Sequence, residues 1–177
     1  MAISRLFTAD SDLDWLIAAV ASGDSDALAQ LYYETSTGVY AYAFSILNNG
    51  QDAEDVLQDC FLRIQSSAGT YRADGKPMAW ILTITKHLCM DLLRRKKNTA
   101  TLTYDMSIPD SDPEDRFVVE ACLKILTEEE RQIVVLHAVS GVRHREVAQI
   151  MGLPVSTVLS KYRRALKKMK NHLGKER

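Results

Sequence analysis

The sequence predicts an all-α protein of two small helical domains, and three observations support this fold class. Glycine and proline are scarce, with 8 and 4 residues among 177. Apolar residues recur at helical spacing in most segments, whereas the strict alternation typical of strands is rare. A polar stretch with two prolines, residues 98–115, separates the two helical parts. We therefore expect domains at 1–97 and 116–177, joined by a flexible acidic linker.

The composition limits the class of protein further. Apolar residues make up 46% and charged residues 25%, as in ordinary soluble globular proteins. Apolar runs such as 41–47 are far shorter than the roughly 20 residues of a membrane span, and the N-terminus has no signal-peptide pattern. Cys60, Cys89 and Cys122 form no C-x-x-C pair. We expect reduced core thiols in a cytoplasmic protein that does not insert into a membrane.

The N-terminal domain contains four predicted helices. Residues 14–47 hold two amphipathic stretches that are separated at Ser22-Gly23-Asp24, and residues 48–50 form a loop. A third helix is expected at about 52–66 and a fourth at about 77–97.

The third of these helices has two distinct faces. One face is apolar and predicts core packing, while a second stripe at i, i+3, i+4 and i+7 spacing is polar. This stripe consists of Asp55, Gln58, Asp59, Leu62 and Gln65. An acidic stripe with one exposed leucine suits a helix that docks on a partner, and an ordinary solvated face is the alternative.

A polar loop, YRADGKPM at 71–78, precedes the fourth helix, which ends in Arg94-Arg95-Lys96-Lys97. A tyrosine and an arginine beside a basic helix could bind unstacked bases and the DNA backbone. The alternative is a core helix whose basic end is favoured by the helix dipole alone.

The formal net charge of −1 is a misleading average. Residues 1–97 hold 12 acids and 9 bases, a net charge of −3. Residues 98–115 hold 5 acids and no base, whereas residues 116–177 hold 6 acids and 13 bases, a net charge of +7. A basic C-terminal domain on an acidic tether points to a nucleic-acid partner for that domain.

The C-terminal domain has the layout of a helix-turn-helix. Thr127 and Glu130 have the spacing of a capping box, which predicts a helix that ends near Gly141. A short helix at about 143–151 follows, then a sharp turn at Gly152 and a longer basic helix over about 154–172.

The last of these helices combines an apolar stripe with a hydroxyl-rich and cationic face. Small hydroxyls at its start suit the major groove, and the cations that follow suit phosphates. A three-helix bundle that binds no DNA is the alternative. The candidate DNA-binding residues are Ser156, Thr157, Ser160, Lys161, Arg163, Arg164 and Lys167.

Three ordered runs resemble the bacterial sigma-70 family, in its compact extracytoplasmic-function (ECF) group. They are DAEDVLQDCFLRIQ at 52–65, KPMAWILTITKHLCMDLLRRKKN at 76–98 and ILTEEERQIVVLHAVSGVRHREVAQIMGLPVSTVLSKYRRALKKM at 125–169. The resemblance implies a subunit that binds core RNA polymerase and directs promoter recognition, melting and initiation. It implies no catalytic residue, metal or cofactor in this chain, since the polymerase performs the chemistry.

The resemblance also implies roles for particular residues. The N-terminal domain is expected to dock on the polymerase β′ coiled coil through Asp55, Gln58, Asp59 and Leu62. It is also expected to engage the minus-10 element, and the C-terminal domain to read the minus-35 element and meet the β flap. The residues carried over for the minus-10 element are Tyr71, Arg72, Lys76, Trp80, Lys86 and Arg94.

Several features remain open at this point. Many relatives have Lys or Arg where this chain has Leu159, and leucine can touch a thymine methyl but cannot donate a hydrogen bond to a base. The resemblance implies an anti-sigma partner, which the sequence does not identify. The competing functions are a helix-turn-helix regulator that does not join polymerase and a helical adaptor that binds no DNA.

Overall fold

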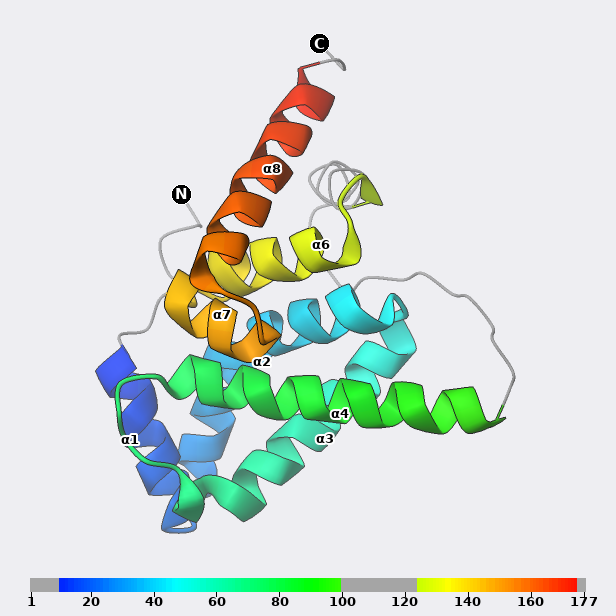
Figure 1. The fold of residues 1–177 in the computed structure, drawn as a ribbon. Helices are drawn as coiled ribbons and strands as arrows, with labels where there is room; N and C mark the ends of the chain where they lie inside the picture. Colours follow the sequence, from blue (N-terminus) through cyan, green and yellow to red (C-terminus); the bar gives the residue numbers. More distant parts are fainter. Residues whose placement is uncertain (1–9, 100–123, 175–177) are drawn as a thin grey trace.

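The computed structural model describes residues 10–99 and 124–174, and every regular element in these ranges is helical, which confirms the all-α class (Figure 1). Residues 100–115 of the expected linker and Cys122 lie outside the described ranges. In chain order the elements are α1 (Asp10–Ala21), α2 (Ser25–Leu47), α3 (Gly50–Ser67), the 3₁₀ turn η1 (Ala68–Thr70), α4 (Pro77–Thr99), α6 (Glu128–Val134), the π-helical turn η2 (Val135–Val139), α7 (His144–Met151) and α8 (Val155–Leu173).

In the first half, α1 to α4, side chains cap the starts of α2 and α3. Asp24 accepts hydrogen bonds from the backbone of Asp26 and Ala27, at 2.9 and 3.0 Å, and so begins α2. Asn48 ends α2 in the left-handed region, and the Asn49 side chain caps α3. The predicted helix boundaries are therefore nearly correct.

The second half, α6 to α8, follows the predicted helix-turn-helix with one difference. The capping box of Thr127 and Glu130 is present. The helix predicted to end near Gly141 changes to π geometry, in which the Ser140 amide donates to the Val135 carbonyl at 3.0 Å. The sharp turn at Gly152 is confirmed by its φ of +68°.

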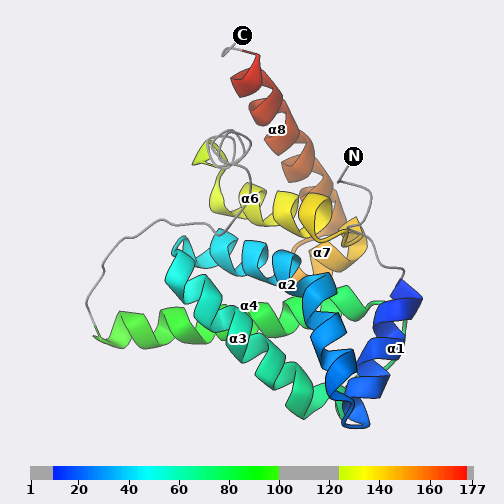
Figure 2. The ribbon, with the colours of Figure 1, turned by 180° about the vertical axis from the view of Figure 1, so that it is seen from behind.

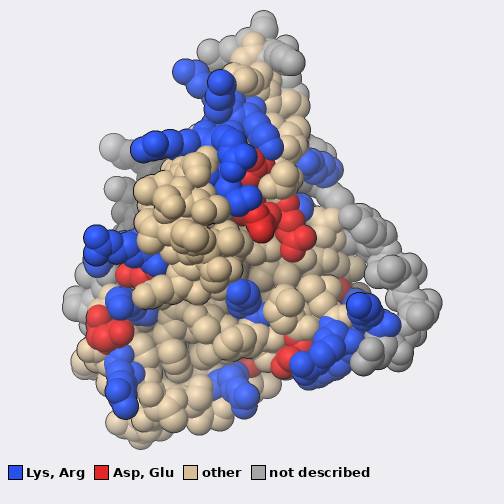
Figure 3. All heavy atoms as spheres, viewed as in Figure 1, with Lys and Arg blue, Asp and Glu red and all other residues tan. Residues whose placement is uncertain are grey.

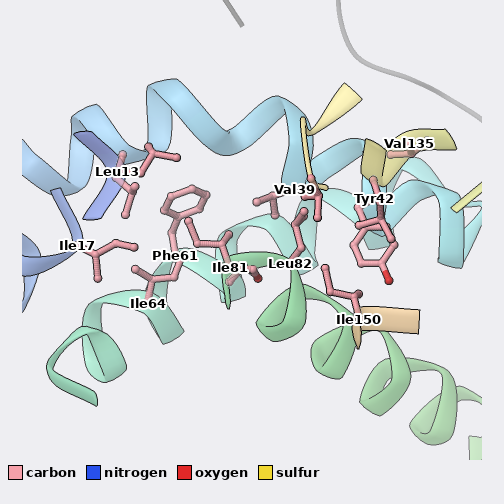
Figure 4. Packing of buried hydrophobic residues seen from close by; sticks show 14 of the residues in the cluster. Leu13, Ile17, Val39, Tyr42, Phe61, Ile64, Ile81, Leu82, Val135 and Ile150 are labelled. Atoms are coloured by element: carbon pink, nitrogen blue, oxygen red, sulfur yellow. The ribbon is translucent and has the colours of Figure 1, made fainter. Parts of the chain in front are cut away.

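The two halves pack against each other. In Figures 1 and 2 the α6–η2–α7 segment lies on α2 and α4, and α8 projects away from them. Val135 and Ile150 join the same hydrophobic cluster as Tyr42 and Leu82 (Figure 4). The largest hydrophobic cluster of the described residues thus contains residues of both halves.

None of the helices in the described part of the chain has the length and apolar character that crossing a bilayer requires.

Candidate nucleic-acid and polymerase interfaces

A groove of about 560 Å³ lies where the two halves meet, and it gathers most of the residues expected at the minus-10 element. On the first-half side its lining comes from the 71–78 loop and α4, and on the opposite side α7 contributes Glu146 and Gln149. We call it the interdomain groove. Five of the six predicted minus-10 residues line it: Tyr71, Arg72, Lys76, Trp80 and Lys86.

The sixth residue, Arg94, lies apart from the groove near the end of α4. Its guanidinium pairs with Asp91 at 3.0 Å on an exposed surface. It lies eight residues beyond Lys86, which is about 12 Å along the helix axis. Any contact of Arg94 with DNA is therefore separate from the groove.

An aromatic pair forms one wall of the groove. The ring centroids of Tyr71 and Trp80 lie 4.9 Å apart, with 48° between the ring planes. Trp80 is partly buried against the core, and the rest of its surface faces the groove. The Tyr71 hydroxyl donates a hydrogen bond to Asp14 Oδ1 of α1. Burial, followed by this hydrogen bond, raises the pKa of Tyr71, so its phenol is a neutral donor.

One cation of the groove is already engaged by the second half. The Lys86 ammonium donates to the Ile150 carbonyl at 2.5 Å, near the C-terminal end of α7, where helix carbonyls lack intrahelical partners. This bond ties α7 to the side of α4 that carries the predicted minus-10 residues. Lys86 is half-buried and still lines the groove with the rest of its side chain.

The basic face of α8 is open to solvent. Figure 3 shows Lys and Arg side chains gathered along this helix. Five of the predicted minus-35 residues are exposed, and Thr157 and Lys161 are half-buried. The exposed ones are Ser156, Ser160, Arg163, Arg164 and Lys167.

Two lysines of α8 are paired within the second half. The Lys161 ammonium lies 2.5 Å from the Glu129 carboxylate. To bind DNA as predicted, Lys161 must leave this carboxylate and bind a phosphate instead. The Lys168 ammonium lies 2.6 Å from Glu130, whose side chain is 4% exposed. Burial would raise the pKa of Glu130, but the bonds from Lys168 and the Thr127 amide outweigh it and lower the pKa. Lys168 therefore helps to fix α8 against α6.

An imidazole pair positions α7 and α8 relative to each other. The rings of His137 and His144 lie 3.9 Å apart, and Tyr162 of α8 contacts both edge-on at 5.0 and 5.1 Å. Burial, and then the neighbouring His137, lower the pKa of His144. The histidines show no metal-ligand spacing in the sequence, and the described residues contain no group of three side chains that could hold a metal.

The predicted docking stripe on α3 is fully exposed. The buried face of this helix consists of Ala53, Val56, Cys60, Phe61 and Ile64. Asp55, Gln58 and Asp59 lie outside that face, and Leu62 is 65% exposed. Two of these four residues are negatively charged, and the leucine side chain is exposed. The stripe can therefore offer a partner both ion pairs and an apolar contact.

Comparison with known proteins identifies the family. The chain matches the family models of sigma-70 region 2 over residues 31–99 and sigma-70 region 4 over residues 116–169. The ECF RNA polymerase sigma factor SigK of Mycobacterium ulcerans (strain Agy99) is 32% identical over 92% of this chain and 94% of its own. The chain is an ECF sigma factor of the sigma-70 family. A second relative, SigK of Mycobacterium bovis (strain BCG / Pasteur 1173P2), is 30% identical with the same coverage.

Solved structures support the same fold for this sigma factor. CnrH, in complex with the cytosolic domain of CnrY, has a TM-score of 0.69 and 25% identity, and covers 94% of this chain and 99% of its own. RpoE, in complex with the anti-sigma factor NepR from Bartonella quintana, has a TM-score of 0.70 and 21% identity, and covers 84% and 97%. The predicted family is therefore confirmed, and the protein is a non-enzymatic initiation factor.

The structure adds several residues of this sigma factor that the sequence analysis missed. Asp14 binds Tyr71, which is 57 positions away in the chain. Lys96 binds Asp52 at 2.6 Å and so ties the end of α4 to the start of α3. A sequence pattern within one helix cannot predict these pairs, because the distance between the two side chains depends on how their helices pack together.

Proposed function

We propose that this sigma factor binds core RNA polymerase through the exposed stripe on α3 formed by Asp55, Gln58, Asp59 and Leu62. The single observation that carries this proposal is that the four residues share one solvent-exposed face while the opposite face of α3 is buried. The partner surface is the β′ coiled coil, where basic and apolar side chains would complement the stripe. Leu62 supplies the apolar contact, and the carboxylates supply orientation.

The interdomain groove is proposed to hold an unpaired base of the minus-10 element on the non-template strand. Tyr71 and Trp80 provide a stacking surface, and stacking on an aromatic side chain is worth about 1–3 kcal/mol per base. This offsets much of the few kcal/mol needed to take a base out of the duplex. Arg72, Lys76 and Lys86 supply cations for the neighbouring phosphates, and Arg94 meets the backbone at a separate point.

The basic face of α8 is proposed to read the minus-35 element. Ser156 and Ser160 lie at the N-terminal part of the helix, which in helix-turn-helix proteins meets the base edges. Arg163, Arg164 and Lys167 contact the phosphates, together with Thr157 and Lys161. Leu159 adds an apolar contact, which favours a thymine methyl over a hydrogen-bonded base edge.

The arrangement of the two halves is proposed to change when DNA binds. In this structure Lys86 donates to the Ile150 carbonyl, and α7 forms one side of the interdomain groove. We propose that binding to polymerase separates a domain at 1–97 from a domain at 116–177, with residues 98–115 as the tether and the β flap as the site for the second domain. The protein is proposed to act in the cytoplasm.

An anti-sigma partner is also proposed. RpoE was solved in complex with the anti-sigma factor NepR, and CnrH in complex with the cytosolic domain of CnrY. The two proposed DNA-binding surfaces carry basic side chains. An acidic or helical inhibitor could bind and cover them when no DNA is bound.

The most informative test is run-off transcription with core polymerase on a genomic fragment library. We expect transcripts that start downstream of a shared pair of sequence elements, and these elements define the promoter. Addition of the protein without any gain in promoter-specific transcripts would contradict the proposed function. A Leu62→Lys variant, which leaves both DNA-binding surfaces intact, should lose the activity through weaker binding to the core enzyme.

A further inference from the structure

Asp14 of α1 lies outside the part of the chain that matches sigma-70 region 2, yet it reaches the proposed minus-10 site. The Tyr71 hydroxyl donates a hydrogen bond to Asp14 Oδ1, and the same tyrosine ring contacts Trp80 at 4.9 Å. Three separate segments, α1, the loop after η1 and α4, thus meet at one aromatic pair.

The position of Asp14 is itself well determined. Its neighbours Leu13 and Ile17 are buried in the main core, with 5% and 0% of their surface exposed. They hold α1 at a fixed rotation about its axis, so the carboxylate of Asp14 projects at a fixed place beside the loop. Asp12, two residues earlier, is exposed and lies on nearly the opposite side of α1 from Asp14.

The tyrosine, in contrast, belongs to a loop outside the helices. Tyr71 follows the short turn η1, where its amide donates to the Ala68 carbonyl at 3.1 Å, and its ring packs partly against the main core. The backbone amide of Lys76 also bonds to the Tyr71 hydroxyl. A ring in such a loop has several rotamers available, and ordering it costs conformational entropy. A charge-assisted hydrogen bond at the far end of the ring selects one of them.

We propose that Asp14 is a positioning residue that holds Tyr71 against Trp80, so that the pair forms a preorganised stacking surface for an unpaired DNA base. Asp14 itself touches no DNA in this proposal. A surface that is already ordered binds a base more tightly, because less freedom is lost on binding. This inference rests on the proposed minus-10 function of the groove.

The test measures how reconstituted holoenzyme binds a fluorescein-labelled non-template oligonucleotide that carries the minus-10 element found by run-off transcription. We expect Asp14→Ala and Tyr71→Phe each to weaken binding about tenfold, the scale of one hydrogen bond to a charged group. The double variant should be no weaker than Tyr71→Phe alone, because that substitution already removes the bond to Asp14. Asp14→Asn, which keeps an acceptor oxygen, should recover part of the loss, and Asp12→Ala should match the unaltered protein.

A second readout separates positioning from a general effect on stability. The protein has two tryptophans, so a Trp15→Phe background leaves Trp80 as the single tryptophan, which can be excited selectively over the tyrosines. In that background, Asp14→Ala and Tyr71→Phe should shift Trp80 emission to the red by the same amount, since both release the ring that covers it. Affinity for core polymerase and for duplex minus-35 DNA should stay unchanged.

The outcomes distinguish this inference from the function on which it rests. If Tyr71→Ala and Trp80→Ala weaken oligonucleotide binding while Asp14→Ala and Tyr71→Phe do not, the groove binds the base and the positioning role of Asp14 is wrong. If the two alanine variants at the aromatic pair have no effect either, the minus-10 assignment itself fails. Additive losses in the double variant would also overturn the positioning role.

Discussion

Gly38 offers a direct way to test whether contact between the two halves limits access to the interdomain groove. This glycine is buried in the middle of α2, where a Cβ would lie 2.9 Å from Met78 Cε and 3.0 Å from Ser140 Oγ. The methionine methyl can turn aside at little cost. Ser140 belongs to the second half, and the hydrogen bond from its amide to the Val135 carbonyl fixes its backbone. Its hydroxyl can rotate away, but its Cβ stays 3.4 Å from the added methyl, so full relief requires the halves to move apart.

The expected magnitude follows from these two contacts. Overpacking of a close contact costs about 1–3 kcal/mol, and the freedom of the Met78 methyl places Gly38→Ala at the lower end. A cost of about 1 kcal/mol changes the ratio of open to closed protein about fivefold. Within α2 itself the substitution is favourable by about 1 kcal/mol, because alanine is the better helix former. The first half therefore keeps its fold while its contact with the second half weakens.

The assay compares the affinity of the free protein and of the holoenzyme for the minus-10 oligonucleotide. When only the open form binds, apparent affinity scales with the open fraction, so Gly38→Ala should bind up to about fivefold more tightly as free protein. In holoenzyme, where we propose that the halves separate, it should bind as the unaltered protein does. Gly69→Ala is the matched control, since a Cβ at Gly69 meets nothing within 4 Å. Equal affinities of the two variants as free proteins would refute the reasoning.

Three further predictions concern the other surfaces. Asp59→Lys reverses one charge of the α3 stripe and should weaken binding to core polymerase at least tenfold, while the melting temperature stays the same. An unchanged affinity in a titration would contradict the docking model. Arg164→Ala should weaken binding to duplex minus-35 DNA and reduce the slope of log affinity against log salt by about one; an unaltered slope would show that Arg164 contacts no phosphate. The free energy of unfolding should fall as the pH drops below about 6.5. The folded protein lowers the pKa of His144, so the unfolded chain, in which this pKa returns to its ordinary value, binds more protons in this range and is favoured. Urea unfolding at pH 7.5 and 5.5 should show a smaller difference for His144→Gln, and an equal difference would exclude this histidine as the source.

The sequence was sufficient for features that depend on neighbours along the chain. Thr127 and Glu130 are three residues apart, so their capping box could be read directly, and Gly152 marked its turn for the same reason. The π-helical turn after Val134 could not be predicted, because it depends on how η2 packs on α2.

The candidate site shows the same limit. Tyr71, Arg72 and Lys76 fall in one loop, so the sequence alone places them together, but their neighbours in the groove include residues of α7 at least 70 positions away. The bond from Lys86 to Ile150 joins residues 64 positions apart. Such contacts depend on the packing of the two halves, which no periodicity within either half encodes.

The shared core has a consequence for how the protein loses its structure. Val135 and Ile150 of the second half are buried among Tyr42 and Leu82 of the first, so the free chain should melt in a single cooperative calorimetric transition. Once the halves are apart, each must rely on its own smaller core, and the transition should divide into two. The number of heat-absorption peaks would then report directly on which form a partner or a variant selects.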